Sequence, residues 1–119
     1  MLETKQLGNK GEEAVVTWLQ RDGFDILSRN YQTRLGEVDV IAAKDEYIVF
    51  VEVKTRNTQY FPISQTVTYG KQQRIIKAAR NFILVKQLRD KVFRFDVATV
   101  IFNNNEHTIE YIPNAFWAR

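Results

Sequence analysis

Two carboxylates and a lysine in the first half of the chain have the types and spacing to do chemistry. Asp39 lies in the apolar segment 36–43, and Glu52 and Lys54 lie near the end of the apolar segment 47–56. Successive side chains of a β-strand point to opposite faces, so Glu52 and Lys54, two residues apart, should lie side by side. Carboxylate oxygens are the ligands that hard divalent cations prefer, and a lysine beside them can stabilise developing negative charge. These three residues could therefore hold a hydrated divalent cation next to a reactive centre.

The two segments read as the strands of one hairpin, and the position of its turn sets the distance between the carboxylates. A turn centred on Lys44 and Asp45 places Asp39 opposite Phe50 and diagonal to Glu52 on the same face. Diagonal neighbours in an antiparallel pair lie roughly 7 to 8 Å apart at Cα. One hydrated cation could bridge two carboxylates at that separation. The four apolar residues before Glu52 are typical of a central strand that is covered on both faces, so the charged pair should lie at the rim of the core.

Helices and further strands must position this hairpin. Apolar residues at helical spacing predict helices over residues 6–21 and 71–87. Residues 28–35 are interpreted as a polar and basic connection, and residues 57–70 as a loop with Pro62 as its clearest breaker. Strands are expected over residues 24–27, 36–43, 47–56, 93–102 and 108–112. This order of elements predicts one compact α/β domain over residues 1–119.

The composition narrows the class of protein. With 119 residues, of which 45% are hydrophobic, the chain can bury one modest core. It has no cysteine and one histidine, which excludes disulfides and thiolate metal sites and argues against zinc. The start lacks the apolar segment of a signal peptide and no run could span a membrane, so a cytoplasmic protein without membrane contact is expected. A net charge of +3 permits a polyanionic partner.

The acidic pair and lysine, preceded by a helix that carries Glu12, resemble the site of the PD-(D/E)XK nuclease superfamily. Val38 stands where the superfamily name has proline, a position that varies widely. A wider set of blocks across the chain resembles the YraN-type family of small bacterial proteins: Gly8, Gly11-Glu12, Arg29-Asn30-Tyr31, Gly36 to Asp39, Phe50 to Arg56, Lys71-Gln72, Arg94 to Val97 and Asn114-Ala115-Phe116. The resemblance implies a restriction-endonuclease-like core, in which a central mixed β-sheet is flanked by helices.

The same resemblance implies a Mg²⁺- or Mn²⁺-dependent phosphodiesterase that cuts DNA. Its catalytic residues would be Asp39, Glu52 and Lys54. Asp39, Glu52 and the backbone carbonyl of Val53 would hold the metal, and Glu12 matches a helix carboxylate that resolvase-like members direct at it. Lys54 would orient the attacking water or stabilise the charged transition state.

Nucleic acid is the expected partner, DNA in preference to RNA, with branched or structured DNA as the preferred substrate. Arg34 and Arg56 flank the two strands of the hairpin, and Lys71, Gln72 and Arg74 lie at the start of the second predicted helix. These five residues are the candidates for contacts with nucleic acid. A homodimer is compatible with the resemblance, because superfamily members that cut both strands often dimerise.

Simpler interpretations of the same residues remain open. Glu52 and Lys54 alone could form a same-face ion pair worth about 0.2 to 1 kcal/mol, and basic helix residues are commonly a solvated face. Glu37 could face solvent or support the site, and Asp96 is expected to have a structural role at the start of its strand. The alternative function is a nucleic-acid-binding module of the same fold with little or no catalytic activity. A protein-interaction scaffold has no positive feature in its favour.

Overall fold

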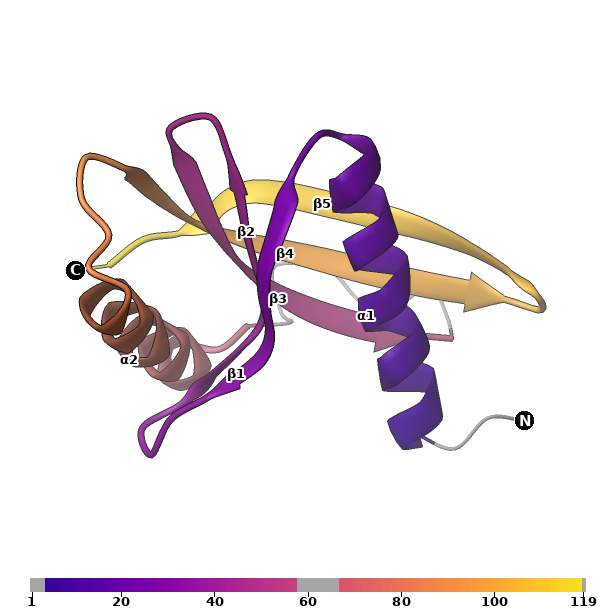
Figure 1. Cartoon of the computed structure of the whole chain (residues 1–119). Coiled ribbons are helices and arrows are strands. Elements are labelled where there is room, and N and C mark those ends of the chain that lie inside the picture. The colour runs from indigo at the N-terminus through magenta and orange to yellow at the C-terminus, as the bar shows by residue number, and fades with distance from the viewer. Residues whose placement is uncertain (1–3, 58–66, 119) are drawn as a thin grey trace.

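Two helices lie on opposite faces of a five-stranded sheet (Figure 1). The computed structural model describes residues 4–57 and 67–118. Its elements are α1 (Thr4–Arg21), β1 (Asp25–Gln32), β2 (Glu37–Lys44), β3 (Tyr47–Arg56), α2 (Tyr69–Val85), β4 (Val92–Asn103) and β5 (Glu106–Phe116). Neither helix in this described part of the chain is long and apolar enough to cross a membrane. The fold is α/β and is consistent with a restriction-endonuclease-like core, as the sequence predicted.

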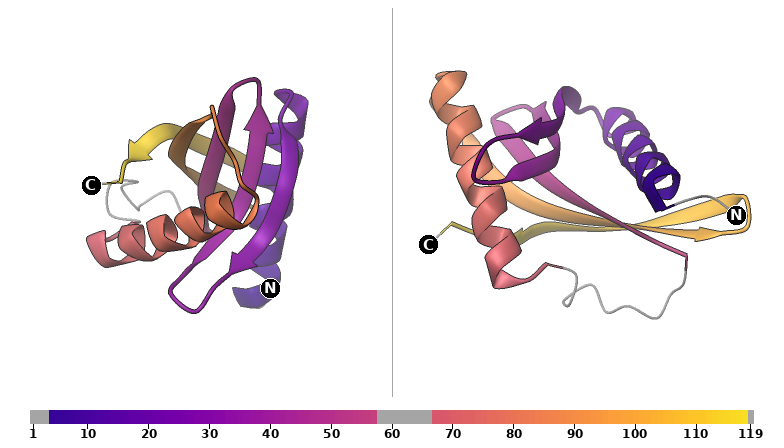
Figure 2. Two further views of the ribbon diagram at one scale, coloured as in Figure 1. Left: turned by 60° about the vertical axis from the view of Figure 1, so that its left-hand side comes forward. Right: turned by 90° about the horizontal axis from the view of Figure 1, so that it is seen from below.

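The sheet is mixed, and its strand order follows the chain from β1 to β5. β3 and β4 are parallel, whereas the other neighbouring pairs are antiparallel. Parallel neighbours need a crossover connection, which here contains α2. β4 and β5 then form a long twisted hairpin (Figure 2). The crossover places α2 on the face of the sheet opposite to α1.

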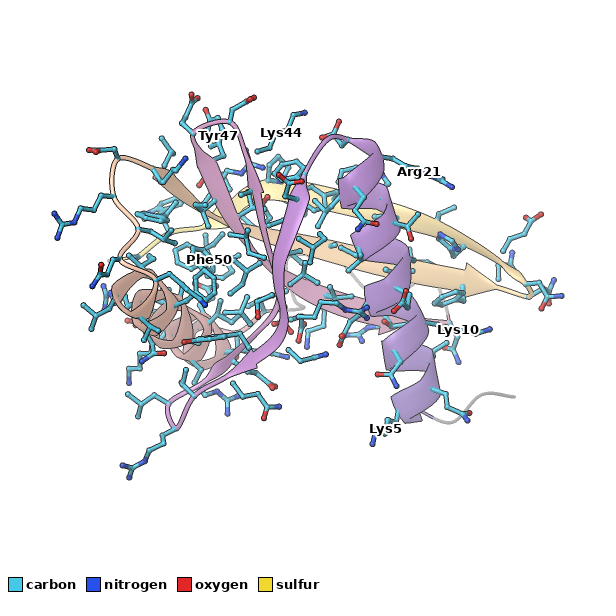
Figure 3. The ribbon with its side chains drawn as sticks, in the orientation of Figure 1. Lys5, Lys10, Arg21, Lys44, Tyr47 and Phe50 are labelled. Carbon is cyan, nitrogen blue, oxygen red and sulfur yellow. The ribbon has the colours of Figure 1, made fainter. Side chains whose placement is uncertain are left out.

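Each helix closes a separate apolar core against its face of the sheet. The core under α1 contains Val15 and Leu19 of the helix, together with Val40, Ala42, Val49, Val51, Ala98 and Val100 of the strands. The core under α2 is aromatic: Phe50 packs edge-on against Phe82 at 6.3 Å and stacks on Phe95 at 5.5 Å. Phe50 accordingly lies between the sheet and α2 in Figure 3. β3 is therefore covered on both faces, which confirms the central strand expected from its apolar run.

The register of the β2–β3 hairpin differs from the prediction. Phe50 lies opposite Ile41, and the turn begins at Asp45, which adopts a φ of 54°. Aspartate tolerates this left-handed conformation because its short polar side chain can bond locally. The expected pairing of Phe50 with Asp39, which placed Asp39 diagonal to Glu52, was therefore wrong. The paired part of β2 and β3 ends at Val40 and Val51, before Asp39 and Glu52 are reached.

β1 is longer than predicted. It continues to Gln32 through residues that were interpreted as a polar connection, and it pairs with β2 as far as Gln32 and Glu37. An edge strand with one exposed side can consist largely of polar residues, and a bulge between Ile26 and Ser28 further disturbs the alternation. Both features hide a strand from pattern analysis.

The predicted loop over residues 57–70 extended two residues too far, because α2 already begins at Tyr69. Residues 58–66 lie outside the described part of the chain, and Tyr69 and Gly70 already belong to α2. The side chain of Thr68 caps this helix by accepting a hydrogen bond from the backbone N–H of Lys71 at 3.2 Å.

Asp96 lies inside β4 and not at the start of the strand. It is fully buried, and both oxygens accept hydrogen bonds from the Arg94 guanidinium at 2.9 Å. The Tyr111 hydroxyl and the backbone N–H of Asn114 also donate to it, the latter at 2.8 Å. Burial raises the pKa of Tyr111, and the adjacent Asp96 carboxylate adds to that rise. Asp96 thereby binds the stretch of β5 where the pairing with β4 is irregular.

Candidate functional site

The site lies where β2 and β3 separate. Their last paired residues are Val40 and Val51, whereas β3 continues beside β4 as far as Arg56. The N–H of Val53, just past this fork, donates to Oδ2 of Asp39 at 2.8 Å. The Asp39 carboxylate therefore spans the fork and supplies the acceptor that a neighbouring strand would otherwise provide.

Glu52 is buried on the α2 side of β3 and binds two lysines. Its side chain is 4% exposed, and its Oε1 lies 3.5 Å from Nζ of Lys54 and 2.9 Å from Nζ of Lys71. A buried carboxylate needs such partners. The predicted side-by-side arrangement of Glu52 and Lys54 is present, but the shorter of the two ion pairs comes from α2.

Asp39 is held in an environment that disfavours its charge. Burial raises its pKa to about 7, and the negative charge of Glu52 adds to the rise, while the hydrogen bond from Val53 opposes it. The carboxylates of Glu12 and Glu37 raise the pKa of Asp39 further. Burial next to other carboxylates therefore makes the negative charge of Asp39 costly, as is common for ionisable groups in functional sites.

The two lysines are perturbed in opposite directions. Burial, together with the neighbouring Lys71, holds the pKa of Lys54 below its ordinary value. Burial is the largest single effect on Lys71 and acts to lower its pKa. The hydrogen bonds with Glu52 and Lys54 and the negative charges of Glu52 and Asp39 together outweigh it, so the pKa of Lys71 is raised. Lys71 is therefore the firmly charged partner of Glu52.

Glu12 approaches the fork from the other helix. Gly11 packs so closely on β3 that a Cβ at this position would overlap the Thr55 side-chain hydroxyl. The next residue, Glu12, is half-buried and accepts a hydrogen bond from Nδ2 of Asn30 at 3.0 Å. Burial raises the pKa of Glu12, and the Asn30 bond opposes this shift. The negative charge of Glu12 thus helps to raise the pKa of Asp39, while one oxygen of Glu12 is hydrogen-bonded to Asn30 of β1.

Sequence reasoning missed two polar residues beside the site. Asn30 lies in the part of β1 that was interpreted as a connection, so no strand pattern pointed to it. Thr99 of β4 pairs with Lys54, is 2% exposed, and its hydroxyl has no hydrogen-bond partner within the described residues.

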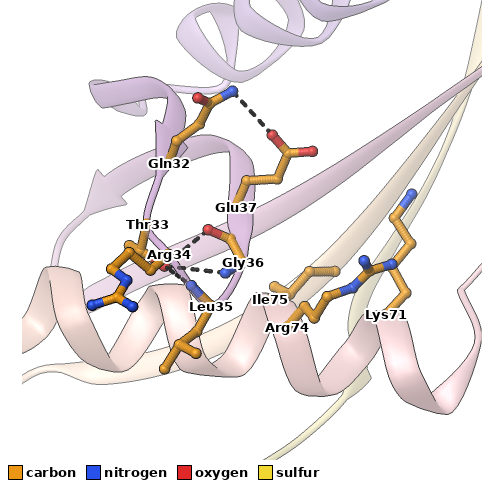
Figure 4. Close-up of a pocket in the computed structure, with 9 residues that line it drawn as sticks. All are labelled: Gln32, Thr33, Arg34, Leu35, Gly36, Glu37, Lys71, Arg74 and Ile75. Carbon is orange, nitrogen blue, oxygen red and sulfur yellow. Dashed lines mark hydrogen bonds between the residues drawn. The ribbon is translucent and has the colours of Figure 1, made fainter.

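A cleft of about 370 Å³ lies between α2 and the connection from β1 to β2 (Figure 4). It is linked to the site through Lys71, which lines the cleft and binds Glu52. Gly36 allows the close approach, because a Cβ there would overlap the backbone of Arg74. Residues 32–37 line one wall, and Lys71, Arg74 and Ile75 of α2 line the other. Glu37, exposed in this wall, accepts a hydrogen bond from Gln32 at 3.3 Å.

Three of the five predicted nucleic-acid contacts, Arg34, Lys71 and Arg74, line this cleft, whereas Arg56 and Gln72 are not among its lining residues. Lys71 and Arg74 lie together on α2. Arg34 is exposed in the turn between β1 and β2, and Figure 4 shows it on the other side of the view from Lys71. Arg56 is half-buried at the end of β3 and donates to the Thr55 carbonyl at 3.1 Å. The Gln72 amide nitrogen donates to the Val67 carbonyl at 3.2 Å, next to the helix N-cap.

The donor set can be compared with what a divalent cation requires. Within residues 4–57 and 67–118, no three carboxylate or imidazole groups are arranged to hold a metal ion. Mg²⁺, however, commonly keeps several waters and binds proteins through one or two carboxylates. Asp39 and Glu52 offer two such groups from facing strands, so their chemistry fits Mg²⁺ or Mn²⁺.

Known proteins resemble this chain along almost its entire length. A model of the uncharacterised protein family UPF0102 matches residues 11–100. A UPF0102 protein of Geobacter metallireducens is 45% identical over 116 residues, which cover 97% of this chain and 95% of the relative. One from Myxococcus xanthus is 40% identical over 115 residues, covering 96% and 91% of the two chains. One from Alkaliphilus metalliredigens is 44% identical over 114 residues, covering 95% and 99%. The expected YraN-type membership is thereby confirmed, and the chain belongs to the uncharacterised protein family UPF0102.

Proposed function

We propose that this protein is a metal-dependent DNA endonuclease of the PD-(D/E)XK type that acts on branched or structured DNA. The observation that carries the proposal is the fork between β2 and β3. There Asp39 bonds to Val53 and Glu52 bonds to Lys54, so two carboxylates and a lysine lie where the strands separate. None of the ion pairs between described residues involves Asp39. Burial, together with the charge of Glu52, raises its pKa to about 7. A purely structural ion pair therefore does not explain why a second carboxylate lies here.

Asp39, Glu52 and the carbonyl of Val53 would hold Mg²⁺ or Mn²⁺ in this proposal. When bound, such an ion neutralises charge on the phosphate and lowers the pKa of the water that attacks it. Glu12 would contribute once its carboxylate leaves Asn30, which its half-buried position on α1 allows. A cation bound beside Asp39 would offset the burial and the neighbouring negative charges that raise the pKa of this carboxyl group.

Lys54 would act on the phosphate or on the attacking water. Its ammonium group is half-buried and 3.5 Å from Glu52. A donor fixed at that place stabilises the negative charge that grows on the phosphoryl oxygens during hydrolysis. Its lowered pKa also brings proton exchange with water closer to neutral pH.

The cleft supplies the surface for the DNA backbone. Lys71 and Arg74 lie along one wall and Arg34 lies on the other, while Arg56 extends from the end of β3. Phosphate contacts of this kind position a nucleic acid without reading its sequence. That property suits a substrate recognised by its shape, and the resemblance to resolvase-like members supports branched DNA.

A cleavage assay with Mg²⁺ tests the proposal on a four-way junction, a forked duplex and a linear duplex. We expect the wild-type protein to cut a branched substrate, and Asp39→Ala and Lys54→Ala to reduce the rate by at least about 100-fold. Glu110→Ala removes an exposed carboxylate from β5 and is the matched control. Equal cutting by wild type and both site variants would refute the assignment. Light scattering of the cutting species distinguishes a monomer from a homodimer.

A nucleic-acid-binding module with little or no catalytic activity is the second candidate. It is favoured by the two lysines on Glu52, which satisfy that buried carboxylate without any metal. This function predicts salt-dependent binding to DNA and no metal-dependent cleavage. The same assay therefore separates the two candidates.

A further inference from the structure

We propose that Lys71 is an exchangeable counter-cation: it holds Glu52 while the site is free of metal, and moves to a DNA phosphate when a divalent cation takes its place. This inference rests on the proposed function and goes beyond it. An ordinary phosphate-binding lysine would contact DNA equally well with or without metal. Lys71 becomes available to DNA only after the cation has bound.

The contacts place Lys71 and the cation in competition for one atom. Lys71 Nζ lies 2.9 Å from Oε1 of Glu52, closer than Lys54 Nζ at 3.5 Å. Glu52 is almost fully buried, so its charge must be balanced in every state of the protein. A cation bound to the same carboxylate removes the need for the Lys71 ammonium group.

The charges of the site agree with such an exchange. Around Glu52 itself, one buried carboxylate is shared by the ammonium groups of Lys54 and Lys71. A divalent cation bound to the same carboxylate would lie next to both ammonium groups and repel them. Movement of Lys71 toward a phosphate relieves that repulsion and brings a negative group to the site. Lys54 is two residues from Glu52 on the same strand and has less freedom to leave.

The position of Lys71 allows its side chain to move while its backbone stays fixed. Its N–H is bound by the Thr68 cap at the start of α2, and its side chain is partly exposed along the cleft. Figure 4 shows Lys71 beside Arg74 on the same side of the cleft. A lysine carries its charge on a flexible four-carbon stem, so the ammonium group can reach either Glu52 or the open cleft.

Arg74 provides a matched control. It lies three residues after Lys71 on α2, lines the same cleft, and is exposed. None of the ion pairs between described residues involves it. Replacing Arg74 removes one positive charge from the cleft and leaves the Glu52 contacts in place.

The first experiment measures Mn²⁺ affinity without DNA, from the signal of free Mn²⁺ in electron paramagnetic resonance. We expect Lys71→Met to bind Mn²⁺ about tenfold more tightly than wild type, the order of one hydrogen bond to a charged group. Arg74→Met should change the affinity by less than about twofold. Lys71→Gln should behave like Lys71→Met, and thermal denaturation checks that both variants are folded. Equal affinities for Lys71→Met and Arg74→Met would overturn the inference.

The second experiment measures binding to a DNA junction with EDTA and with Ca²⁺, a weaker Lewis acid that limits cleavage. Lys71→Met should leave the affinity within about twofold of wild type in EDTA and weaken it about tenfold in Ca²⁺. Arg74→Met should weaken binding similarly under both conditions. Equal weakening by Lys71→Met in EDTA and Ca²⁺ would overturn the exchange.

The two experiments separate this inference from the proposed function. Metal-linked behaviour of Lys71 in a protein that never cuts DNA would support the exchange and refute the nuclease. If neither wild type nor Lys71→Met binds Mn²⁺, both are refuted.

Discussion

At the scale of single residues, Asp39 combines a structural and a chemical role. Its Oδ2 accepts the Val53 N–H where β2 and β3 part, and its other oxygen is not needed for that bond. The same carboxylate is partly buried beside Glu52, which makes its negative charge costly. An asparagine could keep the hydrogen bond and remove the charge, so these two roles can be separated.

Asp39→Asn is expected to stabilise the metal-free protein above neutral pH. The pKa of Asp39 is raised from its ordinary value of 3.8 to about 7, so the folded state binds more protons than the unfolded state between these values. The wild-type protein therefore loses stability as the pH rises through this range. At pH 8 in EDTA the variant should gain about 1 to 2 kcal/mol in the free energy of unfolding, a part of the full shift because water screens the half-buried group. Below about pH 4 the gain should vanish.

Urea denaturation at both pH values provides the measurement. Asp25→Asn makes the same chemical change at an exposed position of β1 and should alter stability by less than about 0.5 kcal/mol at either pH. A gain for Asp39→Asn that is the same at low and high pH would show that the charge is not its cause.

At the scale of elements, the close packing of α1 against β3 determines where Glu12 lies. Gly11 meets Thr55 with no room for a Cβ, and Val15 and Leu19 fill the core along the same side of the helix. The carboxylate next to Gly11 is thereby brought within electrostatic range of Asp39. A change in the distance between this helix and the sheet should affect stability and the site together.

Gly11→Ala is expected to destabilise the protein by about 1 to 3 kcal/mol, because the added methyl group must push α1 away from Thr55. Gly8→Ala, in the same helix, meets no atom within 4 Å. It should stabilise the protein by about 0.5 to 1 kcal/mol, since alanine favours helix more than glycine does. Thermal denaturation of both variants measures the contrast. Two equal effects would mean that helix propensity, and not the contact with β3, governs this position.

At the scale of the whole molecule, the distribution of charge matters more than the net charge of +3. Carboxylates gather at the fork, and basic side chains from α2 and the β1–β2 turn line the adjacent cleft. In the proposed function, the basic residues would attract the DNA backbone to the cleft, and a cation held by the acidic pair would offset the repulsion between the carboxylates and a phosphate. This is an electrostatic arrangement that a composition cannot reveal.

The salt dependence of DNA binding tests this arrangement. Arg74→Gln should reduce the slope of log K against log salt by about 0.9, the value for one lost phosphate contact on a duplex. Arg89→Gln removes an exposed charge beyond the other end of α2 and should leave the slope unchanged. Fluorescence anisotropy with a labelled duplex over a range of salt gives both slopes. Equal losses from the two variants would place the DNA elsewhere.

The sequence by itself determined the elements of the fold and the face shared by Glu52 and Lys54. Helical spacing, apolar runs and strand alternation are local patterns, so α1, α2 and the central strand could be predicted from neighbouring residues. The prediction ended the polar edge strand β1 too early, because residues 28–32 show no clear alternation of polar and apolar residues and so give no local signal of a strand.

Only the tertiary structure decided how the polar residues meet. The turn at Asp45 lies one residue later than predicted, and the pairing of β2 with β3 ends at Val40 and Val51. Asp39 therefore meets the N–H of Val53 across the fork. The bonds from Lys71 to Glu52 and from Asn30 to Glu12 join residues 19 and 18 positions apart, on elements brought together by packing against the sheet. Such contacts depend on how helices and strands are seated in three dimensions, and no local pattern in the chain encodes them.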